Sequence, residues 1–213
     1  MIKTIRYYAN KVFLKLQTYA FLPLLWRGTR SGIIGLCCFF LFSSFTWRTY
    51  LSYDSPQEIV QANATLFYVR ASNSLYSYDT KDQSVRTFDK VNGLSDCNIT
   101  HIAYNKTAHR LVVAYENQNI DLVNDAGQVT NVSAYYNTST TYNKTINSLY
   151  AYNRYVFMAT AFGIMKLNAA EAEVSDTYKL GFSVDYCYVR DGQIYAASKT
   201  AGIYSASLTA NLA

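Results

Sequence analysis

One pattern occurs four times along the 213 residues of this chain: an apolar strand, a turn that carries Asn or Gly, and a second apolar strand. An apolar position near the start of the second strand aligns the copies and recurs at intervals of 45, 44 and 39 residues. These anchors are Leu75, Ile120, Ile164 and Ile203. A period of about 40–45 residues with several short strands per unit is typical of a β-propeller, in which small twisted sheets bury their apolar faces against one another.

The units around these hairpins contain further short strands. An apolar strand precedes each of the last three hairpins, and another follows the first two, at 84–88 and 128–132. Four strands make one antiparallel blade. We therefore predict an all-β fold, an incomplete arc of about four blades whose last blade is truncated, and we expect the chain to be a fragment of a longer protein. The predicted blades span residues 58–90, 99–135, 146–180 and 184–213.

The turns of the four hairpins carry residues that tolerate an unusual backbone conformation. Tight hairpin turns need residues with positive φ, which Gly adopts freely and Asn adopts at little cost. We expect Asn73, Asn119, Gly163 and Gly202 to supply it.

Residues 1–46 have the order of an export leader: a basic flank, an apolar run at 33–42 and small polar residues after it. An apolar run of about ten residues suits a signal sequence and falls short of the roughly 20 that a membrane-spanning helix needs. We predict a helical export leader over 1–46 and a partial propeller over 47–213. An uncleaved amphipathic anchor is the alternative for the leader.

The formal net charge of +5 at pH 7 is concentrated in the leader. Residues 1–48 hold seven basic and no acidic residues, whereas residues 49–213 hold the other 12 basic residues and all 14 acidic ones. A nucleic-acid-binding domain needs Lys and Arg clustered on the domain itself. We therefore expect no nucleic-acid partner.

Residues that could support catalysis or hold a metal ion are few. His101 and His109 are the only histidines, without Cys, Asp or Glu at ligand spacing, and we expect them to be solvated surface residues. Asp121 and Asp125 lack the order of a calcium-binding loop. Sequence motifs of nucleophilic hydrolases, zinc proteases and phosphate-binding loops are absent. We predict a protein that is not an enzyme, with no catalytic residues, no metal and no cofactor.

Two cysteines fall in the predicted propeller. Cys187 aligns with an inward-facing strand position of the repeat, and Cys97 lies in the connector before the second blade. The alignment places them two blades apart, so we expect no disulfide between them.

Three tyrosines lie in the longest connector, between the second and third blades, and are the candidates for binding. They are Tyr135, Tyr136 and Tyr142. Loops on a rigid scaffold often carry function, and a tyrosine offers a rigid ring with a polar end for stacking on a sugar or a peptide. The alternative is that these rings pack against the edges of the blades.

The connector Asn92–Asp96, followed by Ile99, Ile102 and Tyr104, resembles the connectors of two-component-regulator propellers, the periplasmic sensor blades of hybrid kinases. Further runs are similar to the N-terminal propellers of the PorZ family, and the similarity covers about residues 47–210. These runs are 110–115, 119–122, 144–147 and 159–164.

Members of the PorZ family belong to the type IX secretion system. The resemblance implies a non-enzymatic component of the attachment complex at the outer membrane and cell surface, which works with a surface sortase and other attachment-complex proteins and binds or presents anionic lipopolysaccharide. The alternative is the periplasmic ligand-sensing propeller of a hybrid two-component regulator. The family pattern fixes no binding residue in this sequence.

Overall fold

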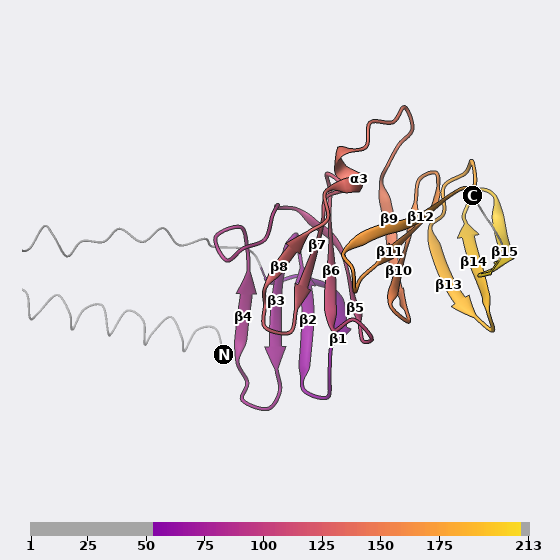
Figure 1. Cartoon of the computed structure of the whole chain (residues 1–213). Helices are drawn as coiled ribbons and strands as arrows, with labels where there is room; N and C mark the ends of the chain where they lie inside the picture. Colours follow the sequence, from indigo (N-terminus) through magenta and orange to yellow (C-terminus); the bar gives the residue numbers. More distant parts are fainter. Residues whose placement is uncertain (1–52, 210–213) are drawn as a thin grey trace, which may run out of the picture. The chain divides into compact units, whose positions relative to one another are not determined.

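The computed structural model of the chain describes residues 53–209, which form fifteen β-strands and one short helix (Figure 1). The predicted helical leader, residues 1–46, lies outside the described residues. Within the described part, no helix is long and apolar enough to cross a membrane.

The strands form four antiparallel sheets, each with its strands in chain order (Figure 1). Three sheets have four strands and the last has three, which confirms the predicted all-β class. Blade 1 contains β1 (Pro56–Gln61), β2 (Leu66–Ala71), β3 (Ser74–Asp79) and β4 (Val85–Phe88). Blade 2 contains β5 (Ile99–Asn105), β6 (Arg110–Tyr115), β7 (Ile120–Asn124) and β8 (Val129–Asn131). Blade 3 contains β9 (Ile146–Tyr152), β10 (Tyr155–Thr160), β11 (Gly163–Asn168) and β12 (Glu173–Lys179). Blade 4 contains β13 (Tyr186–Arg190), β14 (Gln193–Ser198) and β15 (Gly202–Ser207).

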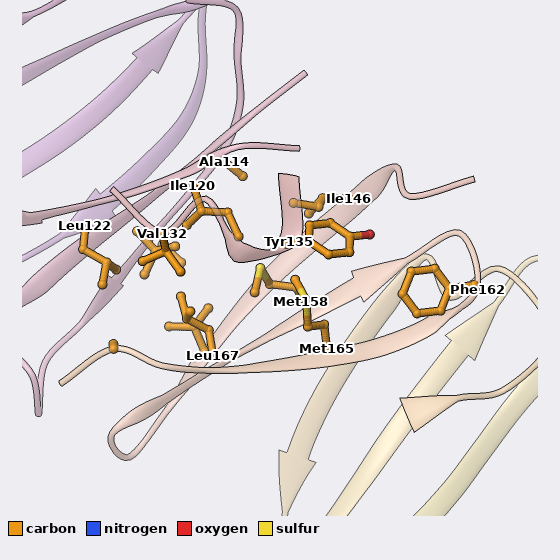
Figure 2. Packing of buried hydrophobic residues seen from close by; sticks show 14 residues of the cluster. Ala114, Ile120, Leu122, Val132, Tyr135, Ile146, Met158, Phe162, Met165 and Leu167 are labelled. Carbon is orange, nitrogen blue, oxygen red and sulfur yellow. The ribbon is translucent and has the colours of Figure 1, made fainter. Parts of the chain in front are cut away.

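Neighbouring blades meet through their first strands: β1 contacts β5, β5 contacts β9, and β9 contacts β13. The blades therefore follow one another as in an incomplete propeller. Three apolar cores form in this way, one between each pair of consecutive blades. Figure 2 shows the core between blades 2 and 3, in which Ile120 and Leu122 lie in one cluster with Met158 and Met165.

The middle strands alternate between two cores, because successive side chains of a strand point to opposite faces of its sheet. On β6, Leu111 and Val113 enter the core between blades 1 and 2, whereas Val112 and Ala114 enter the core between blades 2 and 3. Each fully buried aliphatic side chain stabilises the folded state by about 1.5–3 kcal/mol relative to an exposed one. This two-sided burial explains why the middle strands read as continuous apolar runs.

The hairpin turns follow the prediction in the last two blades and differ from it in the first two. Gly163 and Gly202 have φ of +151° and +93°. In blades 1 and 2 the positive φ instead falls one residue earlier, on Ser72 and Gln118. The two asparagines after them contribute hydrogen bonds instead: the Asn73 carbonyl accepts from the Ile99 N–H, and the Asn119 side chain accepts from the Ile120 N–H.

Cys97 and Cys187 are both free thiols, as predicted. Cys187 is buried between blades 3 and 4. Burial raises the pKa of its thiol to about 12, so it stays protonated at neutral pH. Cys187 therefore packs as a small apolar side chain.

Candidate functional site

The connectors between blades and the turns inside the middle hairpins come together at one end of each blade. An antiparallel blade of four strands returns the chain to this end twice, after its second strand and after its fourth. We call this end the connector face; α3 (Ala134–Asn137) lies on it, in the segment between β8 and β9 (Figure 1). The connector face consists of residues 72–73, 89–98, 116–119, 132–145, 161–162, 180–185 and 199–201.

The helix α3 is held by one lysine. Lys144 Nζ donates hydrogen bonds to the carbonyls of Tyr135 (2.8 Å), Tyr136 (3.1 Å) and Thr138 (2.9 Å). A cation at the end of a helix stabilises carbonyls that have no partner within the helix. In return the Tyr135 hydroxyl donates to the Lys144 carbonyl at 2.6 Å. These contacts fix the connector in place.

The structure places the three candidate tyrosines differently. Tyr135 is buried within the core between blades 2 and 3 (Figure 2), and burial and the nearby Tyr142 raise the pKa of its hydroxyl. Tyr142 is partly exposed, and its ring centre lies 4.6 Å from that of Phe162. Tyr136 is exposed and lies outside the pocket that the other two tyrosines line. Binding by any of the three stays a prediction.

Tyr135 and Tyr142 meet in a pocket of about 110 Å³, which we call the connector pocket. Its lining combines the buried apolar side chains of Phe162 and Met165 with three threonines. The nine lining residues are Ala134, Tyr135, Thr138, Thr140, Tyr142, Phe162, Met165, Val174 and Thr177. An apolar floor with a few polar groups is typical of a small-molecule site.

The connector pocket has a positive edge. None of its lining residues is acidic. Lys179 is exposed, and its Nζ lies 5.8 Å from the centre of the Tyr142 ring. Within residues 53–209, Lys179 forms no ion pair. Lys179 thus makes a cation–π contact with Tyr142 but has no carboxylate partner among these residues, and such a cation favours a neutral or anionic ligand.

Sequence reasoning missed Phe162 and Thr177, which line the pocket from the β10–β11 turn and from β12. It also missed Lys179, which lies beside the pocket at the Tyr142 ring. One signal was present: Phe162 is an aromatic residue in a hairpin turn, between Ala161 and Gly163, where a neighbouring connector could bury its ring.

The family-model comparison finds a match over residues 67–213, to the N-terminal β-propeller domain of PorZ from the type IX secretion system. The chain belongs to this family. A search of curated proteins finds no match.

One solved structure supports the PorZ assignment. PorZ of Porphyromonas gingivalis, described as an essential bacterial surface component of the type IX secretion system, is 28% identical with a TM-score of 0.62. The match covers 76% of this chain and 24% of that protein, so this chain spans about a quarter of its length.

Two further structures share the fold alone. The extracellular domain of BT4673, a putative one-component system of B. thetaiotaomicron, is 16% identical with a TM-score of 0.59, over 75% of this chain and 22% of that one. The computationally designed Ika4 protein is 11% identical with a TM-score of 0.57, over 75% and 95%.

In this PorZ-type propeller, a buried carboxylate orders the connector at 92–96. Asp121 is fully buried on β7, and its oxygens accept hydrogen bonds from the Ser95 N–H (2.7 Å), the Tyr115 hydroxyl (2.6 Å) and the Asn131 amide (2.8 Å). Burial and this carboxylate raise the pKa of Tyr115, which keeps the phenol protonated as a donor. Asp121 therefore links two of the runs that carry the family resemblance.

The prediction that the histidines are solvated is wrong for His101. Its Nδ1 lies 2.8 Å from Glu58 Oε1, and its side chain is 23% exposed. Glu58 Oε2 also accepts from the Ile102 N–H at 2.8 Å and pairs with Arg70 at 3.4 Å. The cluster joins β1 and β2 to a bulge in β5, which a local sequence pattern does not reveal because Glu58 precedes His101 by 43 residues.

The other polar residues of the sequence analysis are separate from this cluster. His109 is exposed and lies 3.3 Å from Asp125, which accepts from the Tyr104 hydroxyl at 2.6 Å. Among residues 53–209, no group of three or more His, Cys, Asp or Glu side chains is arranged to hold a metal ion.

A second pocket, of about 180 Å³, lies between blades 3 and 4. Its lining is almost wholly apolar and includes Ile164, Ile194 and Ala206, which belong to the core between these blades or pack against it. It offers few polar groups that could orient a ligand, so the connector pocket is the better candidate site.

Proposed function

We propose that this chain is part of a non-enzymatic cell-surface component of the type IX secretion attachment complex, which binds or presents anionic lipopolysaccharide to a surface sortase and serves as a scaffold for other complex members. The family match over residues 67–213 carries the proposal. The likeness to PorZ of P. gingivalis, described as a surface component, supports an exported location.

The alternative is a periplasmic ligand-sensing propeller of a hybrid two-component regulator. The connector Asn92–Asp96 favours it, because that motif is similar to the connectors of such sensors. The two proposals differ in what the rest of the gene encodes. A membrane-spanning helix followed by a kinase domain would support the sensor and contradict the secretion component.

The experiment is co-purification of the full-length protein, tagged in its native host, from solubilised outer membranes. We expect the surface sortase and anionic lipopolysaccharide to be enriched over a host strain that carries the same tag on an unrelated outer-membrane protein. Recovery only from the periplasm, without either partner, would contradict the proposal.

A further inference from the structure

The connector pocket is too small for a whole ligand of ordinary size. Pockets for small molecules measure about 300–1,000 Å³, whereas this one is about 110 Å³. A volume of this size accepts a single ring or one short side group. One unit of a longer molecule that continues into solvent meets this limit.

The chemistry of the lining selects among such units. Tyr142 presents a partly exposed ring, and the Phe162 ring packs beside it at an interplanar angle of 53° with 4.6 Å between the ring centres. The Thr138 and Thr140 hydroxyls donate to the backbone carbonyls of Ala134 (2.8 Å) and Tyr142 (3.2 Å), which leaves their oxygens free to accept from a ligand hydroxyl. An apolar ring face beside hydroxyl acceptors matches a sugar, which has C–H groups on one face and O–H groups around its edge.

The charges at the site favour an anionic sugar. Lys179 is exposed beside the Tyr142 ring, and no lining residue is acidic. Lys144 cannot serve in the same way, because its ammonium group already donates to three carbonyls, which is its full capacity. Lys179 is the cation that remains for the ligand.

The pocket is also held ready for binding. Lys144 fixes α3 and the connector, and the Ala161 N–H donates to the Thr145 carbonyl at 3.0 Å, which ties the β10–β11 turn to the same connector. The Phe162 carbonyl accepts from the Leu180 N–H at 3.0 Å, so the three segments that form the pocket are bonded to one another. A rigid site loses less entropy when a ligand binds.

We infer that the connector pocket binds one sugar ring of an anionic polysaccharide, with Tyr142 stacking on the ring and Lys179 contacting its acidic substituent. This inference rests on the proposed function, since it names the part of the glycolipid that the propeller contacts. We expect the glycan rather than the lipid to be the ligand, because the pocket is short and three threonines are among its lining residues.

The test is affinity electrophoresis of the full-length protein through gels that contain lipopolysaccharide from a bacterium with type IX secretion, or the polysaccharide released from it. We expect retardation in both gels and none in neutral dextran. Tyr142→Ala should weaken retardation about tenfold, the effect of losing one aromatic contact. Lys179→Glu should weaken it about fivefold at low salt and less at high salt, because salt screens exposed charges.

Two matched variants serve as controls. Tyr136→Ala removes an exposed tyrosine of the same connector that lies outside the pocket, and Lys106→Glu reverses an exposed charge on the β5–β6 turn, at the opposite end of the blade. Both should be retarded like the unmodified protein. Thermal unfolding of every variant separates lost binding from lost folding.

The outcomes distinguish the inference from the proposed function. Retardation of the unmodified protein that Tyr142→Ala and Lys179→Glu leave unchanged overturns the pocket assignment and leaves the proposed function standing. Retardation by lipopolysaccharide but not by the released polysaccharide also overturns it, in favour of the lipid. Free glucuronate and glucose 6-phosphate at millimolar concentrations should compete with the polysaccharide for the protein, and glucose should compete less. Absence of any retardation of the unmodified protein contradicts both proposals.

Discussion

Single buried polar residues position the connector face. Asp121 is the clearest case: a strand of apolar neighbours contains one fully buried carboxylate, and its three donors come from the connector at 92–96, from β6 and from β8. Burying a carboxylate is costly unless such donors surround it. The conformation of the connector is thus set by a residue more than 20 positions away in the sequence.

Replacing Asp121 by Asn should lower the free energy of unfolding by about 2–3 kcal/mol. Both carboxylate oxygens accept hydrogen bonds, so the amide NH₂ of Asn would point at a hydrogen-bond donor in place of one of them. Chemical denaturation of the folded protein measures this loss. Asp82→Asn is the matched control, since Asp82 is exposed and an Asn there can still accept from the Ser84 N–H. Equal stability of the Asp121 and Asp82 variants would contradict the role given to the buried carboxylate.

Glu58 gives a pH-dependent prediction. Its burial raises the pKa, but the hydrogen bonds from His101 and the Ile102 N–H and the charge of Arg70 outweigh burial, and the pKa lies below the ordinary value of 4.5. A carboxylate with a lowered pKa adds stability above the pKa of the unfolded chain and loses it as the pH falls through the pKa of the folded state.

Glu58→Gln should therefore cost about 1–2 kcal/mol at neutral pH. The difference from the unmodified protein should shrink as the pH falls below about 4.5. Unfolding free energies measured between pH 7 and pH 3 test this. A difference that stays constant over that range would exclude ionisation of Glu58 as its source.

At the level of elements, the blades are built from hairpins whose turns tolerate different substitutions. Gly163 begins β11, and a Cβ built on it would lie 2.0 Å from the Tyr178 carbonyl of β12. Gly202 begins β15 at a similar place in its hairpin, with no atom within 4 Å of such a Cβ. The difference arises because β12 covers the turn of blade 3.

Gly163→Ala should cost at least about 2 kcal/mol, because the new methyl group meets a backbone carbonyl that cannot move without breaking the β11–β12 ladder. Gly202→Ala should cost about 1 kcal/mol from backbone strain alone. Thermal unfolding of the two variants gives the comparison. A larger loss for Gly202→Ala would show that the clash at Gly163 is relieved.

The strands and their blades were predictable from sequence. Strands that are buried on both faces need apolar residues at successive positions, and these apolar runs recur at a nearly fixed interval. Other features were not. The positive φ falls on Ser72 and Gln118, residue types with no preference for that conformation, so the sequence does not mark its position. The helix α3 has only four residues and depends on Lys144. It is too short to show a helical repeat of apolar residues in the sequence. The connector pocket joins three segments, of which sequence analysis identified one.

At the scale of the whole described region, the outer faces of blade 4 differ from those of blades 2 and 3. Ile203 and Tyr204 on β15 are 78% and 50% exposed, and β13 exposes Tyr186 and Tyr188. Within residues 53–209, β15 pairs only with β14. An apolar strand with a free edge promotes association between molecules.

A protein that consists of residues 53–209 alone should therefore self-associate, and Ile203→Lys should reduce the association, because charged residues on edge strands oppose pairing. Sedimentation velocity at several concentrations measures this. Val91→Lys is the matched control: Val91 is also 78% exposed but lies in a connector, so its replacement should change nothing. A monomeric unmodified protein would contradict the prediction.

The alternation of β6 between two cores has a consequence for how such chains evolve. Within residues 53–209, each of the three apolar cores joins two consecutive blades, so the packing of a middle blade depends mainly on its two neighbours. Stability in such an array grows by neighbour-to-neighbour terms. A duplicated blade with the same two packing faces can therefore be inserted between existing blades without changes in the other blades. The near-regular intervals between Leu75, Ile120, Ile164 and Ile203 are the pattern that repeated duplication of one unit would produce.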